Sequence, residues 1–180
     1  MQIDSLSSLK KELLTRLPSE LVQICLGLAK LKTENKQMLA YLLFDSDNPL
    51  AYAEQIKGAI DELLEDIARN QYGGTKTFRK AMQLITQYNR FTKFKQGEIE
   101  LLLHFITRYL EIVSPDTRYP PLLGLAFRAL RKARTLIAKL HEDLQYDYTS
   151  EYNKKVEAVH DTFYHWDRHR FPLQNLDFSS

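Results

Sequence analysis

Apolar residues recur every three or four positions along almost the whole chain, and this spacing limits the possible folds more than any other feature of the sequence. The spacing matches the 3.6-residue turn of an amphipathic helix, and no convincing run of alternating apolar and polar residues indicates a strand. An unbroken i, i+3, i+4 apolar stripe runs from Tyr52 to Ile67. We therefore predict an all-α protein of about eight helices.

Prolines and capping residues predict where several helices begin. Pro18 suits a first helical turn, because the N–H group that proline lacks would be unpaired there anyway. Asn48 and Pro49 combine a capping side chain with the same proline signal. The other predicted boundaries are a break at Gly73 and Gly74, a separation at Gly97, a proline-rich connector over 114–121, a long seventh helix over 122–144 and a cap at Ser150.

Length and composition favour one globular domain. A chain of 180 residues with 44% hydrophobic residues can bury a core without disulfides or metal ions. We predict a single domain over 1–171 and a C-terminal tail over 172–180. Cys25, the only cysteine, lies in an apolar helical stretch, so we expect it to be a small buried core residue.

The N-terminal residues do not predict a signal peptide, and the apolar stretches do not predict a membrane-spanning helix. The first residues lack the basic segment and apolar run of a signal peptide. No stretch approaches the ~20 apolar residues that a membrane-spanning helix needs. The sequence therefore predicts a cytoplasmic protein with no membrane partner.

Two segments of the chain form a faint internal repeat at an offset of 60 residues. Segments 22–43 and 82–103 align Gln23 with Gln83 and place apolar residues opposite apolar residues, such as Leu42 with Leu102. Consecutive antiparallel helix pairs of this kind are typical of α-solenoids. On this ground the chain, from Ser19 to Leu144, resembles HEAT and armadillo-like helical repeat proteins. The resemblance implies an α-α superhelix, and a plain helical bundle stays open as the alternative.

The small net charge of +2 conceals a strong asymmetry along the chain. Residues 1–75 carry a net charge of −3, residues 76–140 a net charge of +9 and residues 141–180 a net charge of −4. Arginines and lysines on one side of a helix can bind phosphates. The resemblance to helical repeat proteins points the same way, because those of the DNA-alkylation-repair type use a basic concave surface on DNA.

Six basic residues are the candidate nucleic-acid or anion-binding residues. Three lie on the predicted fifth helix and three on the predicted seventh helix. The three on the seventh helix face away from its apolar stripe. The six are Lys76, Arg79, Lys80, Arg128, Arg131 and Lys132. The alternative is that the basic middle of the chain pairs with its acidic flanks inside one compact molecule.

The segment before the C-terminal tail holds the densest group of possible metal ligands. His165 and His169 are four residues apart and would share one face of a helix, a spacing that suits zinc. Asp161 is about 12 Å of helical rise from His169, so all three side chains cannot bind one ion on a straight helix. We expect His160, which lies beside apolar residues, to be a hydrogen-bonded residue at the edge of the core.

The sequence contains no motif that identifies an enzyme. A nucleophile elbow, an HExxH motif, a CxxC motif and a dinucleotide-binding glycine cluster are all missing. We therefore favour a non-catalytic module that binds a macromolecule, with a protein partner first and nucleic acid second, and we expect no cofactor. A metal-dependent enzyme using His165 and His169 stays open as a third alternative.

Overall fold

A computed structural model describes residues 4–69, 74–163 and 166–177, the side chains at 66, 68 and 69 excepted. These residues form an all-α structure of eight α-helices without a strand, which confirms the predicted fold class. The chain divides into two compact units, Met1–Asp47 and Asn48–Ser180. The first 47 residues of the predicted domain over 1–171 thus form a unit of their own.

The N-terminal unit consists of three short helices followed by a π-helical turn. The helices are α1 (Leu6–Leu14), α2 (Pro18–Leu31) and α3 (Thr33–Ala40), and the π-helical turn is η1 (Tyr41–Asp45). Pro18 begins α2, as predicted from the missing N–H group. Cys25 is exposed on α2, so the expectation of a buried core cysteine is wrong. The apolar residues around it are exposed as well, because the short helices of this unit enclose almost no interior.

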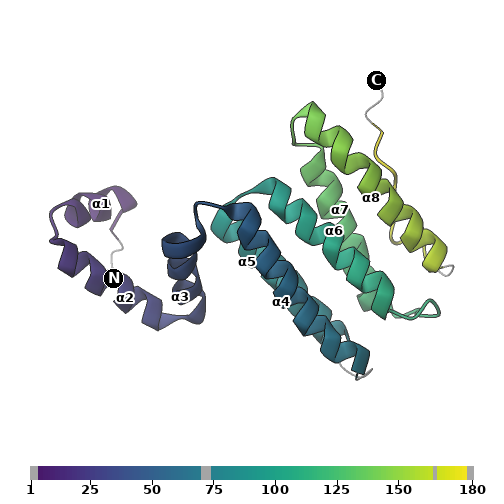
Figure 1. Cartoon of the computed structure of the whole chain (residues 1–180), viewed down its shortest axis with the longest axis horizontal. Helices are drawn as coiled ribbons and strands as arrows, with labels where there is room; N and C mark the ends of the chain where they lie inside the picture. The colour runs from purple at the N-terminus through teal and green to yellow at the C-terminus, as the bar shows by residue number, and fades with distance from the viewer. Residues whose placement is uncertain (1–3, 70–73, 164–165, 178–180) are drawn as a thin grey trace. The chain divides into compact units, whose positions relative to one another are not determined.

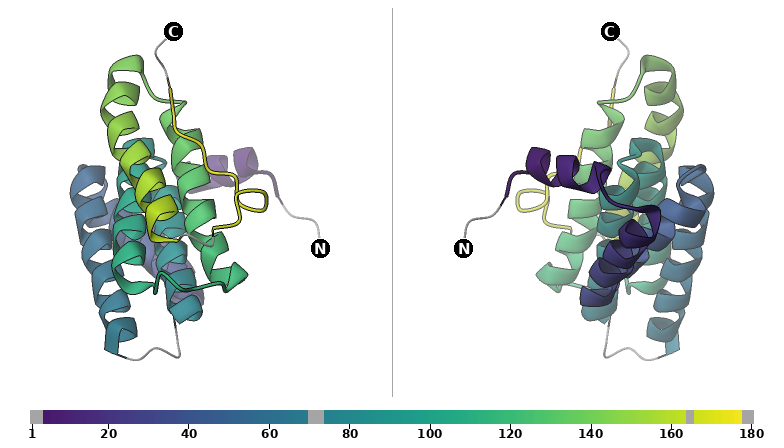
Figure 2. Two further views of the ribbon diagram at one scale, coloured as in Figure 1. Left: turned by 90° about the vertical axis from the view of Figure 1, so that its right-hand side faces the viewer. Right: turned by 90° about the vertical axis from the view of Figure 1, so that its left-hand side faces the viewer.

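The C-terminal unit consists of five long helices in two layers. They are α4 (Pro49–Arg69), α5 (Gly74–Thr92), α6 (Lys95–Ile112), α7 (Pro120–Ile137) and α8 (Glu142–Thr162). Consecutive helices run antiparallel and alternate between the layers. Helices α4, α6 and α8 lie side by side in the first layer, and α5 and α7 lie in the second (Figures 1 and 2).

Helix α6 lies at the centre of the C-terminal unit and contacts each of the other four helices. Its Phe105 and Tyr109 pack against Phe78 of α5, with ring centroids 5.8 Å and 5.2 Å away from it, and Tyr109 also contacts Phe163 after α8. Burial raises the pKa of the Tyr109 hydroxyl above its ordinary range. Three aromatic residues near the C-terminus, Tyr152, Phe163 and Trp166, are also buried in the core, whereas Tyr146 is exposed.

Two predicted helix boundaries are wrong. The long seventh helix over 122–144 ends at Ile137, and α8 begins at Glu142, well before Ser150. No proline or glycine marks this turn, and Leu140 packs partly buried against the core, so the apolar stripe continues across the break. Gly97 does not separate two helices but lies in the first turn of α6. The chain turns instead at Lys93, whose φ of 52° is the single positive value among the described non-glycine residues.

The C-terminal tail docks beside α7 and α8, over the part that is described. Asn153 of α8 donates a hydrogen bond to the Leu176 carbonyl at 2.9 Å and accepts one from its N–H at 2.7 Å. Tyr152 donates to the Gln174 carbonyl at 3.3 Å, and the Phe171 ring packs against Phe127 of α7. The tail thus occupies the place next to α7 in the second layer (Figure 2).

Replacing Asn153 with alanine is expected to release this tail. The substitution leaves the Leu176 amide and carbonyl groups without their partners, at a cost of about 1–3 kcal/mol in the free energy of unfolding. Urea denaturation measures the loss, and limited proteolysis should cut the variant near residue 176 first. Lys154→Ala, one position further along α8 at an exposed site, is the control and should change neither result.

Candidate functional site

The two helices of the second layer carry only basic charge. Helices α5 and α7 together contain eight lysines and arginines and no aspartate or glutamate. The helices of the first layer, α4, α6 and α8, contain fourteen acidic residues and six basic ones. The helices of the two layers therefore have formal net charges of +8 and −8. The fold separates the charge asymmetry of the sequence between two sets of helices in one unit.

Five of the six predicted binding residues are exposed on the second layer. Lys76, Arg79 and Lys80 lie in the first two turns of α5, and Arg128 and Arg131 lie in the middle of α7. Among the described residues, none of these five side chains forms a hydrogen bond or an ion pair. Helices α5 and α7 pack against each other and run in the same direction (Figure 1), so the five residues lie on two neighbouring helices of the same layer. We call these five residues the basic face.

Lys132, the sixth predicted binding residue, has a different environment. Its ammonium group forms an ion pair with the carboxylate of Glu98, which lies in the first turn of α6 and is fully buried. No other polar group of the described residues contacts this carboxylate. Lys132 therefore links α6 and α7 inside the unit, and its position on the helical wheel beside Arg128 did not reveal this.

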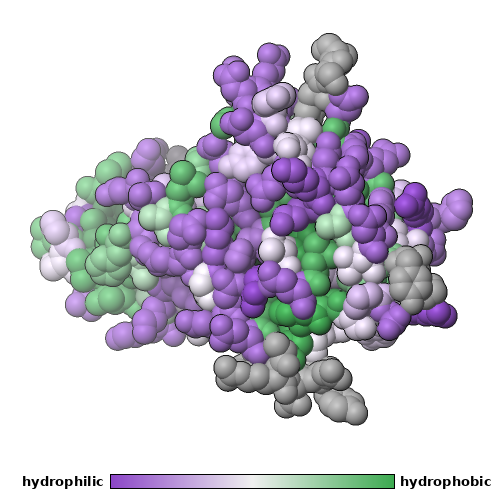
Figure 3. All heavy atoms as spheres, turned by 45° about the vertical axis from the view of Figure 1, so that its right-hand side comes forward, coloured by the Kyte–Doolittle hydropathy of each residue, from purple (hydrophilic) through white to green (hydrophobic). Residues whose placement is uncertain are grey.

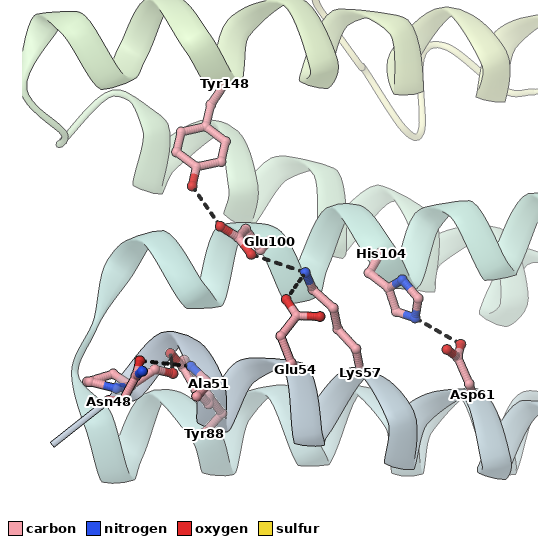
Figure 4. A network of polar contacts seen from close by, with 10 residues as sticks. Asn48, Ala51, Glu54, Lys57, Asp61, Tyr88, Glu100, His104 and Tyr148 are labelled. Atoms are coloured by element: carbon pink, nitrogen blue, oxygen red, sulfur yellow. Dashed lines mark hydrogen bonds and ion pairs between the residues drawn. The ribbon is translucent and has the colours of Figure 1, made fainter. Parts of the chain in front are cut away.

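The first layer carries a polar network that links its three helices (Figure 4). The Lys57 ammonium of α4 donates to Glu54 at 2.6 Å and to Glu100 of α6 at 3.1 Å. The Tyr148 hydroxyl of α8 donates to the other carboxylate oxygen of Glu100 at 3.1 Å. Glu100 is thus the centre of a connection that runs from α4 through α6 to α8.

The pKa shifts of this network favour a structural role for Lys57 and Tyr148. Burial lowers the pKa of Lys57, but its hydrogen bonds with Glu54 and Glu100 outweigh this and raise the net pKa above its ordinary value. Burial and the nearby charge of Glu100 raise the pKa of the Tyr148 hydroxyl above its ordinary range. Both groups keep their protons at neutral pH, so they act as fixed hydrogen-bond donors.

A second polar cluster lies one to two turns further along α4 and α6. His104 Nε2 is 2.8 Å from Asp61 Oδ1, and Arg108 Nε is 3.1 Å from the same oxygen. Arg108 also pairs with Glu111 in the next turn of α6. Nearby, Lys155 of α8 donates to Thr107 at 2.7 Å. These contacts continue the cross-linking of the first layer.

The predicted metal pair is only partly within the described structure. His165 lies outside the described residues, and His169 is exposed in a turn where its backbone N–H donates to Asp167. No group of three or more His, Cys, Asp or Glu side chains in the described ranges can hold a metal ion. The ring of His160 packs against Trp166 with centroids 6.4 Å apart, and its Nε2 finds no hydrogen-bond partner among the described residues. Burial, with the nearby charge of Arg168, lowers the pKa of His160.

The helices show no membrane-spanning character. Across the described ranges, no helix combines the length and the apolar composition that crossing a bilayer requires.

Comparison with family models, curated proteins and solved structures does not explain these features. No family model matches the chain, and neither a curated protein nor a solved structure matches it significantly. Function therefore has to be inferred from this chain's own residues and their geometry.

The sequence did not predict two features of the structure, the burial of Glu98 and the polar network around Glu100. Glu98 reads as an ordinary exposed acidic residue of a first helical turn, yet it is fully buried. Glu100, Lys57 and Tyr148 are separated by more than 40 residues from one another, so no local spacing connects them. Lys95, Gln96 and Glu100 lie close to Glu98 in the sequence, so its local environment gave no signal of burial.

Proposed function

We propose that this protein is a non-catalytic binding module whose basic face binds the phosphate backbone of nucleic acid. The carrying observation is that five exposed basic side chains lie on two adjacent helices that contain no acidic residue. Lysine and arginine contacts to phosphates supply most of the affinity of sequence-independent nucleic-acid binding. A face with this composition has the charge needed for that interaction.

The contacts of the basic residues argue against internal charge balance as their main role. If the basic helices served only to neutralise the acidic layer, their side chains would turn toward it and form ion pairs. Lys132 does so with Glu98, whereas the five residues of the basic face pair with no described residue. Unpaired exposed cations on one face are available to an external polyanion.

The alternation of helices between two layers supports a helical-repeat arrangement for α4 to α8. Each helix packs on the next, and every second helix returns to the same layer, as in an α-α superhelix. We propose that the likeness to HEAT and armadillo-like proteins extends this far, so that the second layer presents a continuous face. Five helices in two layers are also compatible with a bundle.

Fluorescence anisotropy with labelled duplex DNA, single-stranded DNA and RNA tests the proposal. If all five cations of the basic face contact phosphates of duplex DNA, the logarithm of the binding constant should fall with the logarithm of salt concentration with a slope of about −4.5. Replacing Lys76, Arg79 and Lys80 together with glutamine should reduce the slope to about −2 and weaken binding to every sequence alike.

A matched control separates a binding face from a general charge effect. Lys30→Gln, Lys32→Gln and Lys36→Gln remove the same charge from exposed positions of the N-terminal unit. These substitutions should leave the slope near its original value. No binding at about 50 mM salt, or an equal loss in both triple variants, would contradict the proposal.

A further inference from the structure

The N-terminal unit has almost no interior of its own. Tyr41 is the single buried side chain among its described residues. Thirteen large apolar side chains are instead between 41% and 85% exposed. They are Leu6, Leu9, Leu13, Leu14, Leu17, Val22, Ile24, Leu26, Leu28, Leu31, Leu42, Leu43 and Phe44. In Figure 3, hydrophobic residues (green) form a large part of the visible surface of this unit, at the left of the view.

A unit of this size cannot be stable with so little buried apolar surface. Chains below about 40–60 residues bury too small a fraction of their surface to fold alone without disulfides, metals or association. The unit has one cysteine and therefore no internal disulfide. Contiguous exposed apolar surface beyond a few hundred Å² marks an interface in soluble proteins.

We propose that a second copy of this chain covers the apolar surface of the N-terminal unit, so that the protein is a dimer through helices α1 and α2. The rest of the chain offers no matching surface. In the described part of the C-terminal unit, the exposed large apolar side chains are Leu50, Tyr119 and Tyr146, which lie on three separate elements. A second N-terminal unit presents the same apolar set, as the self-complementary interface of a two-fold dimer requires.

The charge of the N-terminal unit also favours a second copy. Residues 1–47 contain six basic and six acidic residues, so two copies carry no net charge that would repel. Helices that lie on membrane surfaces are rich in lysine and arginine on their polar face. The N-terminal unit has six such residues, but six acidic residues balance them, so it carries no net positive charge for an anionic membrane and no net charge to attract either layer of the C-terminal unit.

The local structure of the unit provides interacting helix faces. Leu6, Leu9 and Leu13 of α1 are spaced i, i+3 and i+7 and form one apolar stripe. Helix α2 is held against α3 by the Asn35 side chain, which donates to the Leu28 carbonyl at 2.8 Å. Two copies of such short helices can pack their stripes together as a helical bundle. Stable interfaces use about 20–30 residues from each partner, and the thirteen apolar side chains supply the core of one.

Sedimentation equilibrium of the full chain tests this proposal. The wild-type protein should have twice the 21.1 kDa mass of one chain at micromolar concentration. Leu9→Glu with Leu28→Glu places one charge on each apolar helix, at positions exposed in the single chain, and should weaken the dimer at least about 100-fold. The matched control, Ser7→Glu with Gln23→Glu, adds the same charge to α1 and α2 and should remain dimeric.

A second measurement shows which surface forms the dimer. Cys25 is the only cysteine and is exposed on α2, so donor and acceptor dyes can be attached there without further substitutions. Mixing the two labelled pools should produce energy transfer, which Leu9→Glu with Leu28→Glu abolishes while circular dichroism of the helices persists. A wild-type monomer at about 100 μM, or a dimer that keeps its affinity in the leucine variant, would overturn the proposal. Monomers that bind vesicles of neutral phosphatidylcholine would overturn it in favour of a lipid surface.

Discussion

Replacing Lys132 with methionine is expected to lower the free energy of unfolding by about 3–5 kcal/mol. Glu98 is fully buried at the α6–α7 contact, and Lys132 supplies its only polar contact among the described residues. Without the ammonium group, the carboxylate remains in a low-dielectric interior with neither water nor a counter-charge. Urea denaturation followed by circular dichroism measures the loss, and the slope against urea should stay unchanged.

Two further variants show whether the unpaired buried charge of Glu98 causes the loss of stability in Lys132→Met. Arg131→Met changes the neighbouring exposed cation and should alter the stability by less than about 0.5 kcal/mol. Replacing the pair together, with Lys132→Met and Glu98→Leu, removes both charges and should recover most of the loss, because apolar pairs of similar volume often replace buried ion pairs without penalty. A Lys132→Met variant as stable as Arg131→Met would show that the ion pair contributes nothing.

This result also determines which residues can test nucleic-acid binding. From the sequence, Arg128, Arg131 and Lys132 form one exposed group whose substitution would leave the fold intact. Because Lys132 contacts buried Glu98, a variant that includes it would lose stability together with charge. The basic face is therefore tested with Lys76, Arg79, Lys80, Arg128 and Arg131.

Replacing Gly97 with alanine is expected to destabilise the C-terminal unit by about 1–3 kcal/mol, although alanine is the better helix former. A Cβ atom at this position would lie 1.9 Å from the hydroxyl oxygen and 2.7 Å from Cζ of Tyr88. Tyr88 is fully buried, stacks on Tyr52 and donates to the Pro49 carbonyl at 2.9 Å. The ring is thus held on several sides and cannot move aside without breaking those contacts.

Gly58 provides the control for Gly97. It also lies within a helix, but a Cβ atom there would have no neighbour within 4 Å. Gly58→Ala should therefore stabilise the protein by about 0.5–1 kcal/mol, the ordinary helix preference. The melting temperature, measured by thermal denaturation, should fall for Gly97→Ala and rise for Gly58→Ala. Adding Tyr88→Phe to Gly97→Ala removes the nearest atom and should recover part of the loss, and equal shifts for both glycines would refute the steric explanation.

The sequence determined the helical class because its apolar spacing is a local property. The buried side of a helix follows from residues three and four apart. Pro18 and Pro49 mark helix starts because they lack an N–H group, and Asn48 does so because its side-chain oxygen accepts a hydrogen bond from the N–H of Ala51. The same local reasoning placed Arg128 and Arg131 on the exposed side of their helix. It failed at residues 138–141 because the apolar stripe continues there without proline or glycine.

Only the tertiary structure decided how the helices and their charges are arranged. The spacing of residues along one helix does not predict which other helix packs against it. The alternation of helices between two layers therefore depended on packing, and so did the separation of the eight basic residues of α5 and α7 from the acidic helices. The exposed Cys25 and the buried Glu98 have the same cause. Burial depends on whether another element covers a position, and residues far away in the sequence supply that cover for Glu98 but not for Cys25.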